Sequence, residues 1–105
     1  MKPIILSLIS LCIGYSHCPF LQAEPQQADV FVSGRDGYHT YRIPAVIVTK
    51  KGTVLAFCEG RKKGRSDAGD IDLLLKRSID DGKTWSPQQI VWDDKNNTCG
   101  NPCPV

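Results

Sequence analysis

The sequence has no strong excess of charge of either sign. Its 13 lysines and arginines are almost matched by 11 aspartates and glutamates, which leaves a formal net charge of +2. Binding to nucleic acid or to an anionic membrane surface relies on a large positive field, so we expect neither partner. Hydrophobic residues make up 41% of the chain, a composition typical of a folded globular protein.

Helical patterning and metal-ligand clusters are also lacking. No apolar period of about 3.6 residues continues for more than one turn, which predicts a chain without helices. The two histidines, His17 and His39, do not lie at ligand spacing from the cysteines. We interpret His39 as a turn or packing residue, and we expect no metal ion and no cofactor.

No apolar run is long enough to cross a bilayer. Residues 4–13 are mostly apolar, but a membrane-spanning helix needs about 20 such residues. Lys2 precedes this run, and residues 21–23 follow it as a plausible cleavage site. We therefore predict a secretory signal peptide over residues 1–23 and a mature chain, 24–105, without a transmembrane segment. The mature chain is expected to be secreted, periplasmic or at the cell surface.

The sequence has five cysteines, of which Cys12 and Cys18 fall within the predicted signal peptide. Attachment of lipid to either is the second interpretation, because neither follows the small residue that a lipoprotein signal has there. Cys58, Cys99 and Cys103 remain, and export would permit a disulfide. Cys99 and Cys103 flank a turn, and the sequence leaves open whether they form a local disulfide or stay as two thiols.

Four short segments are rich in β-branched and other apolar residues and are separated by turns with glycine or aspartate. They predict strands over residues 42–49, 53–58, 70–77 and 88–92. Strands joined in this up-and-down order form an antiparallel sheet with two unpaired edges and little core. We therefore predict an all-β fold in which such sheets repeat around an axis, a β-propeller. A small β-sandwich or an open barrel is the alternative.

The loop predicted between the second and third strands, residues 59–69, is longer than a hairpin needs. It is charged and contains three glycines, and long loops commonly carry functional residues. Glu59 can orient Arg61 by an ion pair, which we expect to be weak because surface pairs are. The other cationic side chains are expected to form a solvated rim: Lys62, Lys63 and Arg65.

Arg42 stands at the head of an apolar run, residues 43–48, within the sequence Tyr41-Arg42-Ile43-Pro44. Arginine keeps its charge at any physiological pH, and its planar fork of donors fits a carboxylate. One interpretation is therefore an anion-binding arginine at the mouth of a β-structure. The other is a surface arginine before an ordinary strand.

Residues 78–85 have the form Ser-x-Asp-x-Gly-x-Thr-Trp, with the defining residues Ser78, Asp80, Gly82, Thr84 and Trp85. Asp80 can accept hydrogen bonds from the turn, Gly82 can supply positive φ, and Trp85 can pack back onto the sheet. The motif resembles the Asp box of sialidases and related β-propellers. In that family it is a structural staple away from the active site, and it also occurs in non-catalytic propellers.

The order of motifs is more specific than any one of them. Tyr41-Arg42-Ile43-Pro44 is followed by Glu59-Gly60-Arg61, by Ser66-Asp67 and then by the Asp box. This order resembles the N-terminal part of the catalytic domain of bacterial exo-α-sialidases, over residues 28–105. The resemblance implies a six-bladed β-propeller, of which this chain covers the first blade and the start of the second. The chain stops inside a turn rich in glycine, proline and cysteine, so we expect a longer protein.

The resemblance also implies roles for three residues. Arg42 corresponds to the first of three arginines that hold the substrate carboxylate, and Asp67 to the general acid/base. Arg61 corresponds to an arginine near the 4-hydroxyl of the sugar. Burial beneath bound sugar, with little positive charge close by, is expected to raise the pKa of Asp67. Asp70 is the nearest competitor for that role, and Asp72 is expected to be structural.

The implied reaction is hydrolysis of terminal α-linked sialic acid from glycoproteins, glycolipids and oligosaccharides, with retention of configuration and without a metal. Tyr38 and Tyr41 do not match the nucleophilic tyrosine of the family. That tyrosine, its glutamate partner and two further arginines are expected outside this chain, so we expect the 105 residues alone to be inactive. The alternatives are a non-catalytic Asp-box propeller that binds glycan or protein, and a trans-sialidase with the same residues.

Overall fold

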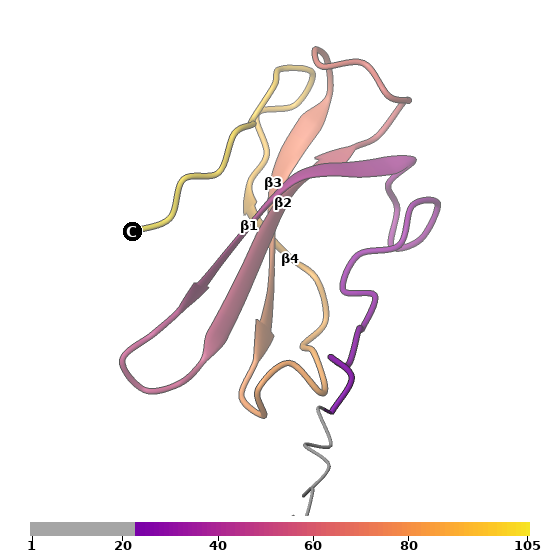
Figure 1. The fold of residues 1–105 in the computed structure, drawn as a ribbon. Helices are drawn as coiled ribbons and strands as arrows, with labels where there is room; N and C mark the ends of the chain where they lie inside the picture. Colours follow the sequence, from indigo (N-terminus) through magenta and orange to yellow (C-terminus); the bar gives the residue numbers. More distant parts are fainter. Residues whose placement is uncertain (1–22) are drawn as a thin grey trace, which may run out of the picture.

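The computed structural model describes residues 23–105, which form one sheet of four strands (Figure 1). The strands are β1 (Thr40–Val48), β2 (Val54–Arg61), β3 (Ile71–Ser78) and β4 (Gln89–Trp92). Neighbouring strands are antiparallel and follow one another in sequence order across the sheet. The predictions of an all-β chain and of an up-and-down sheet are confirmed. The signal peptide predicted over residues 1–23 lies, apart from its last residue, outside the described residues.

The second strand is longer than predicted. β2 continues through Glu59, Gly60 and Arg61, so the loop expected to begin at residue 59 begins only after Arg61. These three residues pair with β1 on one side and with β3 on the other. Charged residues and glycine disfavour a central strand, and they form one here because Glu59 and Arg61 neutralise each other within the fold.

The segment before β1 covers one face of the sheet. Tyr38 packs with the buried Cys58 and Leu74, and Phe31 lies against this cluster. Gly60 makes room for the tyrosine, because a Cβ at this position would lie 2.7 Å from two carbons of the Tyr38 ring. The small core on this face therefore depends on side chains that lie outside the sheet.

The C-terminal segment lies on the other side of the sheet (yellow in Figure 1). Phe57 and Leu73 face this side, because each lies one residue before Cys58 or Leu74 in its strand. Together with residues 102–104 they line a hollow of about 220 Å³. Before the C-terminal segment reaches this hollow, it pairs with the first residue of β3 through a parallel bridge. Both faces of the sheet are thus partly covered by segments that are not strands.

The two edge strands expose apolar side chains. These include Val46 and Val48 on β1, and Ile90 and Trp92 on β4. The part of the chain that the structure describes forms one sheet and no propeller. It has the form of a single blade-like unit with apolar surface at both edges. Within this same part, none of the chain forms a helix long and apolar enough to cross a membrane.

The motif of residues 78–85 forms the turn that follows β3. The Asp80 carboxylate accepts hydrogen bonds from the Thr84 amide (2.9 Å) and hydroxyl (2.6 Å), and the Ser78 hydroxyl donates to it (2.8 Å). Gly82 has a φ of +83°, and its carbonyl accepts a hydrogen bond from the Trp85 indole. Side-chain hydrogen bonds therefore close this turn on both sides of Asp80.

Candidate functional site

A bulge in β1 sets Arg42 apart from the apolar half of the strand. The pairing of β1 with β2 shifts register between Arg42 and Ala45. Ile43, inside the bulge, has a φ of +53°, which a β-branched residue rarely adopts. Arg42 therefore lies at the end of the strand next to the loop of residues 62–70, with its side chain half exposed.

Arg61 and Glu59 lie two residues apart on β2 and form an ion pair on the same face of the sheet. The Nε and Nη2 atoms of Arg61 donate to Oε2 of Glu59 at 3.1 and 2.7 Å. Only 3% and 4% of the two side chains are exposed. The expectation of a weak surface pair is wrong, because β2 extends through these residues and removes both charges from solvent screening.

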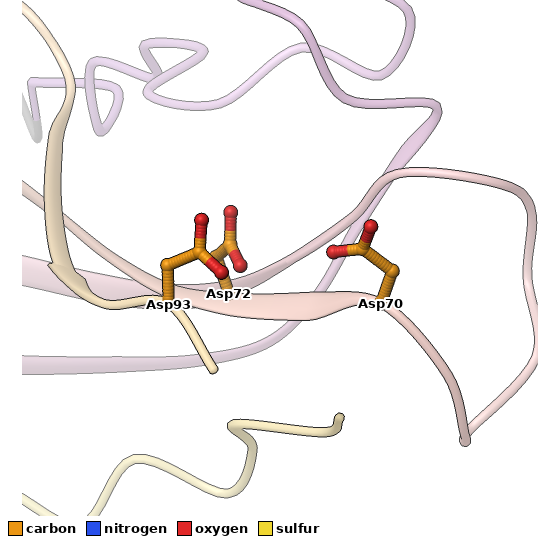
Figure 2. Close-up of side chains that lie close together, drawn as sticks. All are labelled: Asp70, Asp72 and Asp93. Atoms are coloured by element: carbon orange, nitrogen blue, oxygen red, sulfur yellow. The ribbon is translucent and has the colours of Figure 1, made fainter. Parts of the chain in front are cut away.

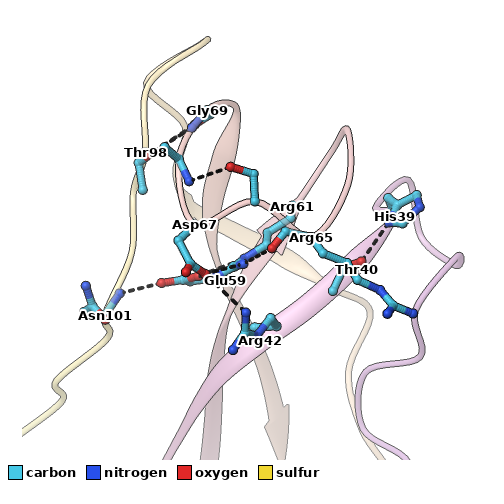
Figure 3. Close-up of polar contacts among 12 residues, drawn as sticks. His39, Thr40, Arg42, Glu59, Arg61, Arg65, Asp67, Gly69, Thr98 and Asn101 are labelled. Carbon is cyan, nitrogen blue, oxygen red and sulfur yellow. Dashed lines mark hydrogen bonds and ion pairs between the residues drawn. The ribbon is translucent and has the colours of Figure 1, made fainter.

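Asp67 brings the site together. Its Oδ1 atom lies 2.7 Å from Nη1 of Arg61 and 3.2 Å from Nη1 of Arg42 (Figure 3). The structure thus places the three residues singled out in the sequence in one network, one each from β1, β2 and the loop. The Asp67 side chain itself remains 81% exposed. It therefore contacts the buried pair of Glu59 and Arg61 from the solvent side.

Two arginines determine the charge state of Asp67 in this structure. The hydrogen bond from Arg61 and the charges of Arg61 and Arg42 lower the pKa of this carboxyl below its usual range. The expectation of little positive charge close by is wrong, because two guanidinium groups contact the same oxygen. The raised pKa was expected beneath bound sugar and stays a prediction. Asp67 is therefore ionised in this structure.

The loop that carries Asp67 is fastened in its middle and at its far end. Within the loop, Nη1 of Arg61 donates to the Arg65 carbonyl at 2.7 Å. At its far end, the Thr98 hydroxyl accepts from the Gly69 amide at 3.0 Å and donates to the Gly69 carbonyl at 3.1 Å. Sequence reasoning missed Thr98, because its partner is 29 residues away and its own surroundings read only as a polar loop.

A hollow beside Arg42 is large enough to hold a small ligand. It has a volume of about 450 Å³, within the range of ligand sites. Arg42 and Arg65 supply two cations to its walls, and His39 lies beside Thr40 with 2.7 Å between their side chains. The remaining wall is Ser33. A site with two guanidinium groups in its wall suits an anionic ligand.

Comparison with known proteins decides the family. No protein-family model matches the chain. It is 45% identical over 65 residues to the sialidase of Micromonospora viridifaciens, a match that covers 62% of this chain and 10% of that protein. It is 43% identical over 75 residues to the exo-alpha-sialidase of Aspergillus fumigatus, covering 66% and 18%. It is 39% identical over 92 residues to the exo-alpha-sialidase of Arthroderma benhamiae, covering 82% and 22%. This chain belongs to the sialidase family.

The sialidase chain spans between 10% and 22% of the lengths of these three relatives. The resemblance inferred from the order of motifs is therefore confirmed for the family. Two of the three relatives are fungal, so the likeness extends beyond the bacterial members that the motifs suggested.

Three carboxylates of the sialidase chain, Asp70, Asp72 and Asp93, lie close enough together to hold a metal ion (Figure 2). The Nζ atom of Lys62 lies 3.0, 3.0 and 3.4 Å from them, in that order. The expectation that Lys62 is a solvated rim residue is wrong, because its ammonium group supplies the cation of this cluster. Hydrogen bonds to Asp70 and Asp72 raise its pKa, so it stays protonated.

These contacts separate Asp67 from its nearest competitors. Asp70 is held by Lys62, whereas Asp67 faces the two arginines. Asp72 is fully buried and accepts a hydrogen bond from the Tyr38 hydroxyl, which is the structural role expected for it.

The cysteines among the described residues of this sialidase chain are Cys58, Cys99 and Cys103, and all three are free thiols. The sequence left open whether Cys99 and Cys103 form a disulfide or stay as two thiols, and in the structure they are two thiols. Burial raises the pKa of the Cys58 thiol to about 12, so this side chain is chemically inert at neutral pH.

Proposed function

We propose that the protein containing this chain is an exo-α-sialidase that hydrolyses terminal α-linked sialic acid from glycoproteins, glycolipids and oligosaccharides. The observation that supports this most is the meeting of Arg42, Arg61 and Asp67 at one point in a chain of the sialidase family. We further propose that the sheet is the first blade of a six-bladed propeller and that the protein is exported. The reaction proceeds with retention and without a metal.

Arg42 binds the carboxylate of sialic acid in this proposal. The Asp67 carboxylate already contacts its guanidinium group at 3.2 Å, which supports the ability of this position to hold an anion. Exposed ion pairs of this kind are weak, so a substrate carboxylate can take the place of Asp67 at little cost. The hollow next to Arg42 then receives the sugar ring.

Asp67 acts as the general acid and then as the general base. Occupation of Arg42 by the substrate carboxylate removes one of the two cations that lower the pKa of Asp67, and exclusion of water by bound sugar raises this pKa further, so the protonated form becomes accessible. The oxygen of the nucleophilic tyrosine bonds to the anomeric carbon and its proton passes to the glutamate partner, while the glycosidic C–O bond breaks and the leaving oxygen takes the proton of Asp67. In the second step the Asp67 carboxylate accepts a proton from water, the water oxygen bonds to the anomeric carbon, and the bond to the tyrosine breaks as the tyrosine regains its proton and sialic acid is released.

Arg61 orients the sugar through hydroxyl groups on the side of the ring near its 4-position. Its Nε and one Nη2 hydrogen are used by Glu59, and its Nη1 atom contacts the Arg65 carbonyl and Asp67. Guanidinium has five donors, so one Nη2 hydrogen remains for substrate. The nucleophilic tyrosine, its glutamate partner and two further arginines come from other parts of the protein.

Substitution of Arg42 tests this proposal. In the full-length protein, Arg42→Lys keeps the charge but loses the planar fork, so kcat/KM for a fluorogenic sialoside should fall about tenfold to a hundredfold. In the Arg42→Ala variant, kcat/KM for the same substrate should fall further. The matched control is Arg77→Lys, since Arg77 is exposed on β3 and its side chain makes no ion pair with any of the residues 23–105 that the structure describes. Unchanged turnover in both Arg42 variants would remove this residue from the site.

The second candidate function is a non-catalytic propeller that binds sialylated glycans. One observation favours it: Asp67 is ionised and paired with two arginines, as in a static binding site. The two functions separate in one assay, because a binding protein would retain sialoside without releasing free sialic acid.

A further inference from the structure

We propose that Glu59 is a positioning residue of the active site, and that Gly100 and Asn101 hold it in place. The inference rests on the proposed function, because it concerns the delivery of Arg61 to the sugar. Glu59 itself is buried and touches no substrate in this account. Its effect on the reaction passes through the guanidinium group of Arg61 and, from there, to Asp67.

Both carboxylate oxygens of Glu59 are occupied by fixed partners. Oε2 accepts from Nε and Nη2 of Arg61, and Oε1 accepts from the backbone amide of Asn101 at 3.0 Å. With 4% of the side chain exposed, water cannot replace either partner easily. The carboxylate is therefore held at two ends, and it fixes the plane of the Arg61 guanidinium.

The orientation of that plane decides what Arg61 presents to the site. With Nε and Nη2 turned towards Glu59, Nη1 points at the loop, where it lies 2.7 Å from both the Arg65 carbonyl and Asp67. A rotation of the guanidinium would break both contacts and move the free Nη2 hydrogen. Figure 3 shows Glu59, Arg61 and Asp67 in this network. Glu59 thus sets the position of the Asp67 loop and, in the proposed function, of the sugar contact.

Gly100 makes this arrangement possible. A Cβ at this position would overlap Oε1 of Glu59 and lie 3.2 Å from its Cδ atom. Gly100 is not among the glycines with positive φ, so its backbone suits any residue and only the space beside Glu59 requires glycine. An alanine here acts on the carboxylate and not on the backbone.

The segment that carries Gly100 is itself fixed, so it cannot move aside freely. The Ile71 amide donates to the Asn97 carbonyl at 3.2 Å, and the Cys99 amide donates to the Ile71 carbonyl at 2.8 Å. Thr98, between them, holds Gly69 at the end of the loop. One short segment, residues 97–101, therefore fastens the Asp67 loop and the partner of Arg61.

The first test compares Gly100→Ala with Gly64→Ala in the full-length protein. Among the described residues, a Cβ at Gly64 meets nothing within 4 Å, so this variant controls for the substitution itself. We expect Gly100→Ala and Glu59→Gln to lower kcat/KM for 4-methylumbelliferyl sialoside about tenfold to a hundredfold, because small displacements of positioning groups cost this much. For the 4-deoxy analogue of that substrate the loss should be clearly smaller. An equal loss on both substrates, or no loss, would overturn the positioning role.

A second measurement does not depend on turnover. The Arg61 Nε–H should give a protected resonance in NMR spectra of the wild-type protein and of Gly64→Ala, and it should lose protection in Gly100→Ala. Protection that survives in Gly100→Ala contradicts the inference. Absence of any sialoside hydrolysis by the wild type would instead contradict the proposed function, and the NMR comparison would still decide the role of Glu59.

Discussion

Asp67 is the residue whose state matters most to this account. In the free structure its carboxylate is exposed, yet it contacts Arg61 and Arg42. In the proposed function, a substrate carboxylate would compete with it for Arg42, so that occupation of the site and protonation of the acid would be linked. The charged network would then keep Asp67 ionised until substrate arrives.

The pKa of Asp67 in the free protein follows from these contacts. Because Arg61 makes the largest contribution, the carboxyl should titrate below an ordinary aspartate, and Arg61→Gln should raise its pKa towards the ordinary value. Carboxyl 13C NMR titration of the full-length protein measures this directly. Arg77→Gln serves as the control, with no change expected at Asp67. A wild-type Asp67 that titrates at or above the usual aspartate value would contradict the contacts described.

Ile43, next to Arg42, stores backbone strain. Its φ of +53° costs a β-branched residue about 1–2 kcal/mol relative to glycine. In an ordinary strand, alanine is more stable than glycine by roughly 0.5–1 kcal/mol. Here the order should reverse, so Ile43→Gly should be more stable to chemical denaturation than Ile43→Ala by about 1 kcal/mol. The usual order of the two variants would mean that the bulge is relaxed in solution.

Among the elements, the turn of residues 78–85 is the one most completely specified by local sequence. Its hydrogen bonds join residues no more than four positions apart, and each defining side chain contributes to them or to the fold of the turn. A motif with such short-range contacts can be read without knowledge of the rest of the chain.

Asp80 gives this turn a pH dependence. Hydrogen bonds from the Thr84 hydroxyl, the Thr84 amide and the Ser78 hydroxyl lower its pKa to about 2. An unfolded aspartate has a pKa of about 3.9, so the stabilisation is fully present above that value and is lost as pH falls towards about 2.

The corresponding experiment compares melting temperatures of Asp80→Asn and wild-type full-length protein. The deficit of the variant should stay constant between about pH 7 and 5 and shrink below about pH 4. Asp81→Asn is the control, since Asp81 is exposed in the same turn and its φ of +58° suits asparagine. A deficit that does not change with pH would show that the Asp80 charge is irrelevant to the turn.

The central part of the sheet shows where sequence reasoning ends. The apolar strand cores were predicted because β-branched and apolar residues mark them locally. The extension of β2 through Arg61 was not predicted, because it depends on pairing with residues of β1 and β3. The burial of Glu59 was also missed, because the Asn101 amide that satisfies it lies 42 residues away. Arg42, Arg61 and Asp67 could be named from motifs, whereas their common contact needed the fold.

At the scale of the whole molecule, the described sheet has apolar side chains uncovered at both edges. Its edge strands expose Val46, Val48, Ile90 and Trp92, and its buried cluster is small. In the proposed propeller, neighbouring blades would cover these side chains. Such a sheet has too little core to fold firmly when separated from its neighbours.

The isolated segment of residues 24–105 should therefore be poorly soluble or molten. We expect its thermal unfolding, followed by near-ultraviolet circular dichroism, to be broad and without a cooperative step. The full-length protein serves as the comparison and should unfold cooperatively. A sharp transition in the isolated segment would show that the sheet is a self-sufficient domain, and would contradict its assignment as one blade of a larger fold.

The central claim is that Asp67 is the general acid of a sialidase, and leaving-group dependence tests it most directly. In the full-length protein, Asp67→Asn should lower kcat/KM for sialyllactose by about 10²- to 10⁴-fold, because the sugar oxygen must be protonated as it leaves. For 4-nitrophenyl sialoside, whose leaving group needs no proton, the loss should be far smaller. Asp81→Asn should match the wild type on both substrates. An equal loss on the two substrates, or undiminished hydrolysis of sialyllactose, would contradict the account.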